Sequence, residues 1–216
     1  VKLGTQYVIE QIAKDRETTV QEIQNIPKHF KKSFTLGDYL LPVEFQLPKL
    51  KEYHEKLKSF KTNNAKTFSW EIVLKRPNGH YLKSVYGSGG IHSANENQAF
   101  FQNDTFQILD EDVEGLYPKI ASEWGFQPIN FPELSTTLKH NIEKRNAIKK
   151  TNKTLSDLLK LGNNGLVGMF KNEHSPFYSP ESNLAICLNG QLLISKATEL
   201  SLLNNIDVFS QNTDGF

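Results

Sequence analysis

Two aspartates, each next to a glycine-containing turn, are the residues of this 216-residue sequence with the clearest chemical potential. Asp112 opens segment 112–118 (DVEGLYP), and Asp214 lies within segment 212–215 (NTDG) near the C-terminus. Carboxylate oxygens are the ligands that Mg²⁺ prefers, and free backbone amides in a following turn can bind phosphate. Taken singly, each segment also fits an ordinary turn, so neither decides between a metal site and a loop.

Segment 160–168 (KLGNNGLVG) combines a lysine, an asparagine and three glycines at helical spacing. Lys160 and Asn164 are four residues apart and would share one helix face, where a lysine can bind phosphate as a point charge. Gly165 would leave room for the close approach of a base pair. Each glycine costs a helix roughly 1 kcal/mol relative to alanine, so three of them require a reason in packing or in function. The alternative is a surface helix weakened by glycine.

A cluster of basic residues stands just before that segment. Arg145 and Lys149 are four residues apart, with Lys144 and Lys150 beside them. On a helix this spacing predicts a cationic face directed at anions. A solvated run of charge is the alternative interpretation.

Segment 86–92 (YGSGGIH) is rich in glycine. Such density lets the backbone approach a ligand, for example a DNA phosphodiester, closely. Its spacing fits neither a dinucleotide-binding fingerprint nor a P-loop. We expect His92 to be structural or solvated, since the spacing of the six histidines gives no zinc-binding pair.

Hydrophobic periodicity predicts the elements that must position these residues. Helices are expected over 1–26, 47–60, 133–145, 151–170 and 184–203. Period-two alternation predicts strands at 68–74 and 80–86, joined by a hairpin turn at Asn78-Gly79. Short apolar strands at 107–109 and 206–209 would lead to the two aspartates. Residues 28–48 are expected to be irregular with one short strand.

Composition limits the function classes. The formal net charge is +1, which argues weakly against a protein that coats DNA. Cys187 is the single cysteine, so an intrachain disulfide is excluded and a cytoplasmic setting is expected. No apolar run approaches the length of a membrane span, so we expect no membrane partner. The chain starts at Val1 and stops soon after Asp214, which suggests a fragment of a longer protein.

The order of these segments resembles family B (α-like) DNA polymerases of the bacteriophage type. That family carries D-x-x-S-L-Y-P, then K-x-x-x-N-S-x-Y-G, then D-T-D, and segments 112–118, 160–168 and 212–214 are similar to them in the same order. Segment 86–90 is similar to the Y-x-G-G region of the family. Arg145 and Lys149 resemble the R-x-x-x-K of its first fingers helix. The resemblance covers about residues 68–216, and residues 1–67 contain no motif that can be placed.

The resemblance implies an α+β fold. An antiparallel-sheet palm would be built from 68–132 and 171–216, with a short two-helix fingers insertion at 133–170. Residues 1–67 would form an N-terminal α/β segment of unassigned role. Asp112 and Asp214 would stand on adjacent strands, and the helix around 184–203 would back the sheet.

The resemblance also implies a role for each candidate residue. Asp112 and Asp214 would be catalytic and bind two Mg²⁺ ions, with Mn²⁺ as an alternative. Tyr117 would lie under the sugar and select dNTPs over rNTPs. The nucleotide-binding residues would be Gly115, Leu116, Tyr117, Arg145, Lys149, Lys160, Asn164 and Gly165. The DNA-binding residues would be Tyr86, Gly89 and Gly90.

The expected activity is DNA-directed DNA synthesis in phage replication, with template–primer DNA and dNTPs as partners. The protein would act as a monomer in the cytoplasm of a bacterial host. Four positions depart from the family pattern: Gly115 and Gly165 replace serines, Val167 replaces the tyrosine, and Asn212 replaces the first aspartate of D-T-D. These departures leave open an alternative, a non-catalytic nucleic-acid-binding domain derived from a polymerase. A structural domain in which every motif is a turn is the third reading. The fragment by itself is expected to be a poor polymerase.

Overall fold

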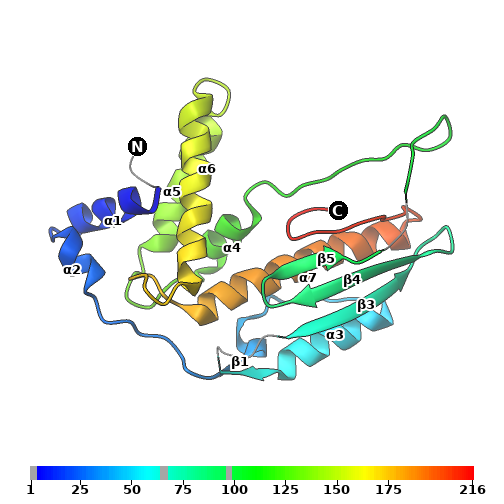
Figure 1. The fold of residues 1–216 in the computed structure, drawn as a ribbon, viewed down its shortest axis with the longest axis horizontal. Coiled ribbons are helices and arrows are strands. Elements are labelled where there is room, and N and C mark those ends of the chain that lie inside the picture. Colours follow the sequence, from blue (N-terminus) through cyan, green and yellow to red (C-terminus); the bar gives the residue numbers. More distant parts are fainter. Residues whose placement is uncertain (1–3, 64–67, 96–98) are drawn as a thin grey trace. The chain divides into compact units, whose positions relative to one another are not determined.

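The computed structural model describes residues 4–63, 68–95 and 99–216, and its fold is mixed α+β, as predicted (Figure 1). The chain divides into two compact units. Unit 1 comprises Val1–Lys32 and Gly115–Ile186, and unit 2 comprises Ser33–Glu114 and Cys187–Phe216. This division differs from the predicted one, because the N-terminal segment is shared between both units.

Unit 1 is helical. Its elements are α1 (Gly4–Asp15), α2 (Val20–Gln24), α4 (Leu116–Trp124), α5 (Leu134–Ile148), α6 (Lys153–Gly168), the 3₁₀ turn η2 (Met169–Lys171) and the start of α7 (Pro180–Leu203). Helices α5 and α6 form a hairpin joined by a four-residue link, and α1 and α4 pack on this pair (Figure 1). Two helices were predicted here, and both are confirmed, with α5 continuing to Ile148.

The core of unit 1 explains these helix boundaries. Leu138 of α5 and Leu166 of α6 are buried. Asn152 caps α6, since its Oδ1 accepts a hydrogen bond from the amide of Leu155 at 3.1 Å. Apolar packing and a side-chain cap therefore stabilise α6 and offset the cost of its glycines to helix stability.

The single helix predicted over 1–26 is wrong, because the chain breaks between α1 and α2. Glu17 has a positive φ of 52°, and Thr19 forms a capping box with Glu22. The Thr19 side chain accepts from the Glu22 amide at 3.1 Å, while the Glu22 carboxylate accepts from the Thr19 amide at 2.9 Å. These reciprocal bonds satisfy amides at a new helix start, which favours two helices over one.

Unit 2 contains a three-stranded antiparallel sheet of order β3–β4–β5, formed by β3 (Ser69–Lys75), β4 (Tyr81–Gly87) and β5 (Gly90–Ser93). The hairpin turn predicted at Asn78-Gly79 is confirmed, with Gly79 at φ 86°. The remaining elements of this unit are β1 (Phe34–Thr35), the 3₁₀ turn η1 (Leu36–Tyr39), α3 (Pro48–Ser59), β2 (Lys61–Thr62) and the C-terminal part of α7.

Helices α3 and α7 cover the same face of this sheet. The ring of Tyr53 on α3 lies 5.6 Å from that of Trp70 and 4.6 Å from that of Tyr86. The Tyr53 hydroxyl donates to Gln191 of α7 at 2.8 Å, and Gln191 donates to the Gly87 carbonyl at 2.6 Å. Alternate residues of β3 and β4 therefore form the core on this side.

The opposite face of the sheet, which we call the open face, carries exposed and charged side chains. Glu71 of β3 lies opposite Val85, and Lys83 of β4 lies opposite Val73. Glu71 and Lys83 form an ion pair of 2.9 Å across the two strands. Tyr81 on the same face is 56% exposed. One covered and one solvated face is the usual arrangement of an antiparallel sheet.

The short strands predicted at 107–109 and 206–209 are not formed. Both segments lack strand hydrogen bonding in the structure. The Phe209 ring instead stacks on the Phe100 ring, with 4.1 Å between the ring centres. The guanidinium of Arg76 lies 5.1 Å from the centre of the Phe100 ring and 5.4 Å from that of the Phe209 ring. Side-chain packing thus holds segment 206–209 where an apolar sequence suggested a ladder.

The capping box predicts a measurable titration. Hydrogen bonds from the Thr18 hydroxyl and from the Thr19 backbone and hydroxyl lower the pKa of Glu22 from 4.5 to about 2. Because the folded pKa is depressed, this contribution to stability is present above pH 4.5 and is lost as the pH falls towards 2. We expect Thr18→Val to raise the Glu22 pKa in an NMR titration, while Thr105→Val leaves it unchanged. An unaltered Glu22 pKa in Thr18→Val would contradict this account.

Candidate metal and nucleotide site

The segments that contain Asp112 and Asp214 are paired in unit 2. Asp112 forms a bridge with Gly215, and the amide of Val113 donates to the carbonyl of Asp214 at 2.7 Å. Glu111 and Phe216 exchange two further backbone bonds of 3.1 and 3.0 Å. The two aspartates are therefore one residue apart in an antiparallel register. The sequence predicted that they would stand on adjacent strands, and neither segment forms a named strand. The pairing is a short bridged ladder rather than a full strand.

A tight hairpin presents Asp214. The Asn212 amide donates to the Gly215 carbonyl at 2.8 Å, which closes the turn. The Asn212 side-chain oxygen accepts from the amides of Asp214 and Gly215 at 3.0 and 2.8 Å. Asn212 therefore builds the turn by an Asx-type pattern, which either asparagine or aspartate can make. Replacing aspartate by asparagine here removes a negative charge and keeps the turn.

Two glycines permit this close approach. A Cβ on Gly215 would lie 2.6 Å from the Glu111 carbonyl oxygen, so any side chain would push the ladder apart. A Cβ on Gly90 would lie 2.8 Å from the Thr213 hydroxyl oxygen. Gly90 was predicted to approach DNA, and the structure gives it another role. It lets β5 pack against the hairpin that carries Asp214.

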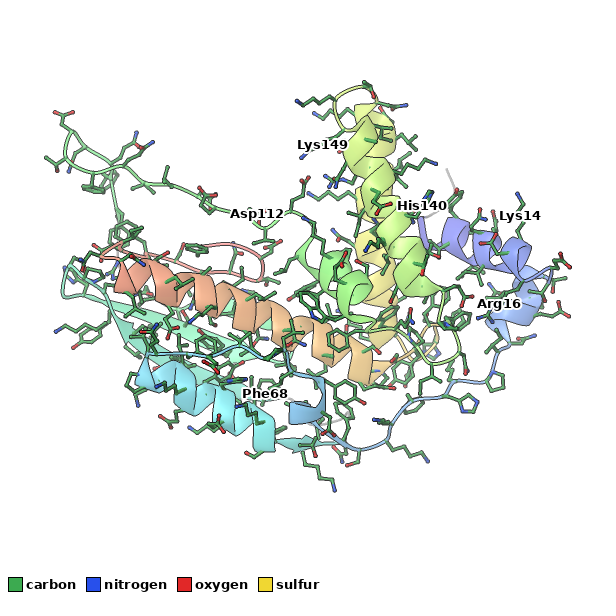
Figure 2. All side chains as sticks on the ribbon, turned by 180° about the vertical axis from the view of Figure 1, so that it is seen from behind. Lys14, Arg16, Phe68, Asp112, His140 and Lys149 are labelled. Carbon is green, nitrogen blue, oxygen red and sulfur yellow. The ribbon has the colours of Figure 1, made fainter. Side chains whose placement is uncertain are left out.

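Hydrogen bonds connect the base of the hairpin to the sheet. The Ser93 amide of β5 donates to the Gln211 carbonyl at 2.9 Å. The side chain of Gln211 points to the covered face, where it bonds Ser84 of β4 and Thr198 of α7. The Asp112 side chain is exposed (Figure 2).

Tyr86 requires a correction. Its side chain is 0% exposed, and its hydroxyl accepts hydrogen bonds from Ser195 at 3.1 Å and from Gln211 at 3.4 Å. Burial raises the pKa of the Tyr86 hydroxyl, against the effect of these hydrogen bonds. The predicted contact of the Tyr86 side chain with DNA is therefore excluded in this structure. Of the three predicted DNA-binding residues, Gly89 is the exposed one, at the tip of the β4–β5 hairpin.

In unit 1, the predicted triphosphate-binding segment forms the N-terminus of α4. Gly115 adopts a left-handed conformation with φ 65° and is the N-cap residue. The Leu116 side chain is buried, so this residue can offer a ligand only its backbone, while Tyr117 is half-buried in the first turn. A helix N-terminus carries amides and a positive dipole end that suit phosphate. The triphosphate role of this segment stays a prediction.

The predicted cationic face is partly wrong. Arg145 is only 8% exposed and lies in the core of unit 1, whereas Lys149 is exposed at the end of α5. On α6, Lys160 and Asn164 are both exposed and share one face, and Gly165 beside them is half-buried. Of the three cationic residues predicted to bind the triphosphate, Lys149 and Lys160 are therefore the exposed ones.

The donor set at the hairpin fits Mg²⁺. Among residues 4–63, 68–95 and 99–216, no three acidic, histidine or cysteine side chains gather closely enough to form a complete metal cage. Mg²⁺ commonly binds through one or two carboxylates and completes its shell with water and substrate phosphates. Asp112 and Asp214 are both exposed and lie on paired backbone segments, so their carboxylates could supply such ligands.

Comparison of the chain with protein-family profiles, with curated proteins and with solved structures found no match. No helix in the part of the chain that the structure describes has the length and apolar character needed to cross a membrane.

Sequence reasoning missed Gln211, which anchors the hairpin. Its side chain is 2% exposed and bonds the hydroxyls of Ser84 at 2.7 Å and Thr198 at 2.9 Å. Its backbone amide donates to the Ser93 hydroxyl at 2.6 Å. These partners come from two strands and α7, so no local pattern in the sequence could reveal them. Gln211 joins the hairpin to the sheet and to the covering helix.

We expect Gln211→Met, which has similar volume but cannot make these bonds, to lower the free energy of unfolding by about 1–3 kcal/mol. It should also speed hydrogen exchange at the amides of Val113 and Gly215, because the hairpin loses its anchor. Chemical denaturation and exchange mass spectrometry measure the two effects. Gln107→Met, at an exposed position, is the matched control. Unchanged exchange at residues 113 and 215 would show that Gln211 does not hold the hairpin.

Proposed function

We propose that this chain is the palm-and-fingers core of a family B (α-like) DNA-directed DNA polymerase that adds dNTPs to a primer 3′-OH. The pairing of Asp112 with the hairpin of Asp214 supports this most directly. Three polymerase-like motifs occur in order along the chain, and the first and third come together beside an antiparallel sheet. Unrelated turns would have no reason to pair in this way.

Each part of the proposed site has a physical task. Two bound Mg²⁺ ions would supply stabilisation of the attacking 3′-oxygen and of the departing pyrophosphate. In unit 2, Asp112 and Asp214 would hold those ions, and the hydrogen bonds of Asn212 keep the hairpin in place. In unit 1, the amides at the N-terminus of α4 and the charge of Lys160 would bind phosphate groups. Tyr117 would select the deoxyribose sugar.

The charge distribution supports a division of labour between the units. Unit 1 carries 15 basic and 10 acidic side chains, for a net charge of +5. Unit 2 carries 10 basic and 14 acidic side chains, for a net charge of −4. A near-neutral total thus conceals a cationic unit suited to phosphates and an acidic unit suited to divalent cations.

A non-catalytic nucleic-acid-binding domain is the second candidate, and two observations favour it. Val167, where the family has tyrosine, is 4% exposed and belongs to the core of unit 1. The side-chain oxygen of Asn212 already accepts two backbone hydrogen bonds, and its amide group carries no charge. This domain would bind DNA without Mg²⁺-dependent affinity for dNTPs, which separates the two proposals.

Calorimetric titration of dNTP with and without Mg²⁺ tests the proposed function. We expect binding that requires Mg²⁺ in the wild type and that is lost in the double variant Asp112→Asn and Asp214→Asn. These substitutions keep side-chain shape and remove charge. Asp38→Asn, which removes an exposed carboxylate of η1, is the control and should bind as the wild type does. Binding that is indifferent to Mg²⁺, or retained in the double variant, would contradict a two-metal site.

Asn212→Asp should increase the affinity for Mg²⁺. Its carboxylate can accept the same two amide hydrogen bonds, so the turn is kept while a negative charge is added beside Asp214. We expect half-maximal dNTP binding at a several-fold lower Mg²⁺ concentration. Asn212→Ala should have the opposite effect, because it removes both bonds and loosens the hairpin. An identical Mg²⁺ dependence in wild type and Asn212→Asp would remove the hairpin from the metal site.

A further inference from the structure

A groove lies between α1 and α5 of unit 1, away from every residue assigned a role above. Its volume is about 310 Å³, and it is lined by turns of both helices, including Tyr7, Gln11, Thr136, His140, Asn141 and Lys144. This volume is at the small end of the range of ligand-binding pockets. Helix α1 lies beside α5 in both views (Figures 1 and 2).

The two walls of the groove are fixed relative to each other. Arg16, just after α1, makes a bidentate ion pair with Glu133, the N-cap residue of α5, at 2.7 and 3.0 Å. The guanidinium also lies 4.9 Å from the centre of the Phe131 ring. Ile9 and Ile12, which do not line the groove, bury another side of α1 in the core of unit 1. Bidentate pairs and core packing give a groove of defined width rather than a gap between mobile helices.

The lining is polar and aromatic. Tyr7 is 51% exposed, and in the ring contacts found among the described residues it has no partner. Gln11 and Asn141 supply amides that can read the edge of a base. Lys144 is exposed and forms no ion pair within the described part of the chain. This combination of a stacking ring, amides and a free cation suits nucleotides.

The acidic content of the groove is small. Asp15 is the carboxylate among its lining residues, and its Oδ1 already accepts a hydrogen bond from Gln11 at 2.8 Å. The unit around the groove has a net charge of +5. A polyanion is therefore attracted to this unit and meets little local repulsion.

We infer that this groove binds single-stranded nucleic acid, with one base stacked on Tyr7 and an adjacent phosphate held by Lys144. A single strand is favoured over a duplex because stacking on a side chain needs an unpaired base with a free face. The identification of that strand as the template rests on the proposed polymerase function. The binding itself does not.

Fluorescence anisotropy of a labelled oligo-dT 12-mer, measured across a salt series on the whole chain, tests the inference. We expect Tyr7→Ala to weaken binding about 5-fold or more without changing the salt dependence, because it removes stacking alone. Lys144→Ala should weaken binding and reduce the slope of log K against log salt by about 0.7, which corresponds to one lost phosphate contact. A general folding defect would not separate the two variants in this way.

Matched variants control for loss of surface area and of charge. Trp124→Ala removes another half-exposed aromatic side chain of unit 1. Lys139→Ala removes an exposed lysine of the same helix α5 that pairs with Glu123 at 3.5 Å. Both controls should bind the oligonucleotide as the wild type does.

Three outcomes would overturn the inference: no binding of the oligonucleotide by the wild type, equal loss in the control variants, or equally tight binding of duplex DNA or of dTMP. The proposed polymerase function is tested separately by Mg²⁺-dependent dNTP binding. Loss of strand binding in Tyr7→Ala with dNTP binding intact would support the groove. Strand binding that depends on Tyr7 in a chain that binds no dNTP would support the groove and contradict the polymerase.

Discussion

The candidate site depends on one constraint, the pairing of residues 111–113 with residues 214–216. Neither segment forms a regular strand. The backbone hydrogen bonds of this short ladder bring the two segments together. Its geometry requires glycine at 215, where a side chain would collide with the backbone of Glu111. On its far side the hairpin is tied through Gln211 to β4, β5 and α7. The hairpin that pairs with the Asp112 segment is thus held in place by hydrogen bonds made on the covered face.

Much of the fold could be predicted from the sequence, because the elements with strong periodicity formed as expected. The strands around Asn78-Gly79 and the helices α3, α5, α6 and α7 follow directly from alternation and from helical spacing. The break between α1 and α2 was missed because apolar residues on both sides of it suggested one helix, although residues 14–19 (KDRETT) contain none and a capping box at Thr19 begins a new helix. The apolar run 206–209 was misread as a strand because Phe209 stacks on Phe100, which is distant in sequence.

The candidate site was predictable only in part, for reasons that differ between residues. The neighbouring positions of Asp112 and Asp214 were expected from motif order. Tyr86 and Arg145 were expected to reach a ligand, yet both are buried. The expectation failed because neither a four-residue spacing nor a nearby glycine shows which side of an element faces the core. The role of Gln211 could not be predicted, because it depends on hydrogen bonds to Ser84 and Ser93, which are more than 100 residues away in the sequence. Burial and long-range hydrogen bonding are properties of the folded chain.

The distance along the chain between the paired segments also bears on how the protein folds. Asp112 and Gly215 are separated by about one hundred residues, which include the whole of α4, α5 and α6. Closing a loop of this length costs entropy that a few hydrogen bonds cannot repay until the sheet and α7 are in place. The paired segments that carry Asp112 and Asp214 should therefore be among the last features to assemble during folding and the first to open under mild destabilisation. A folding intermediate would then possess most of the helices while lacking the two-aspartate arrangement.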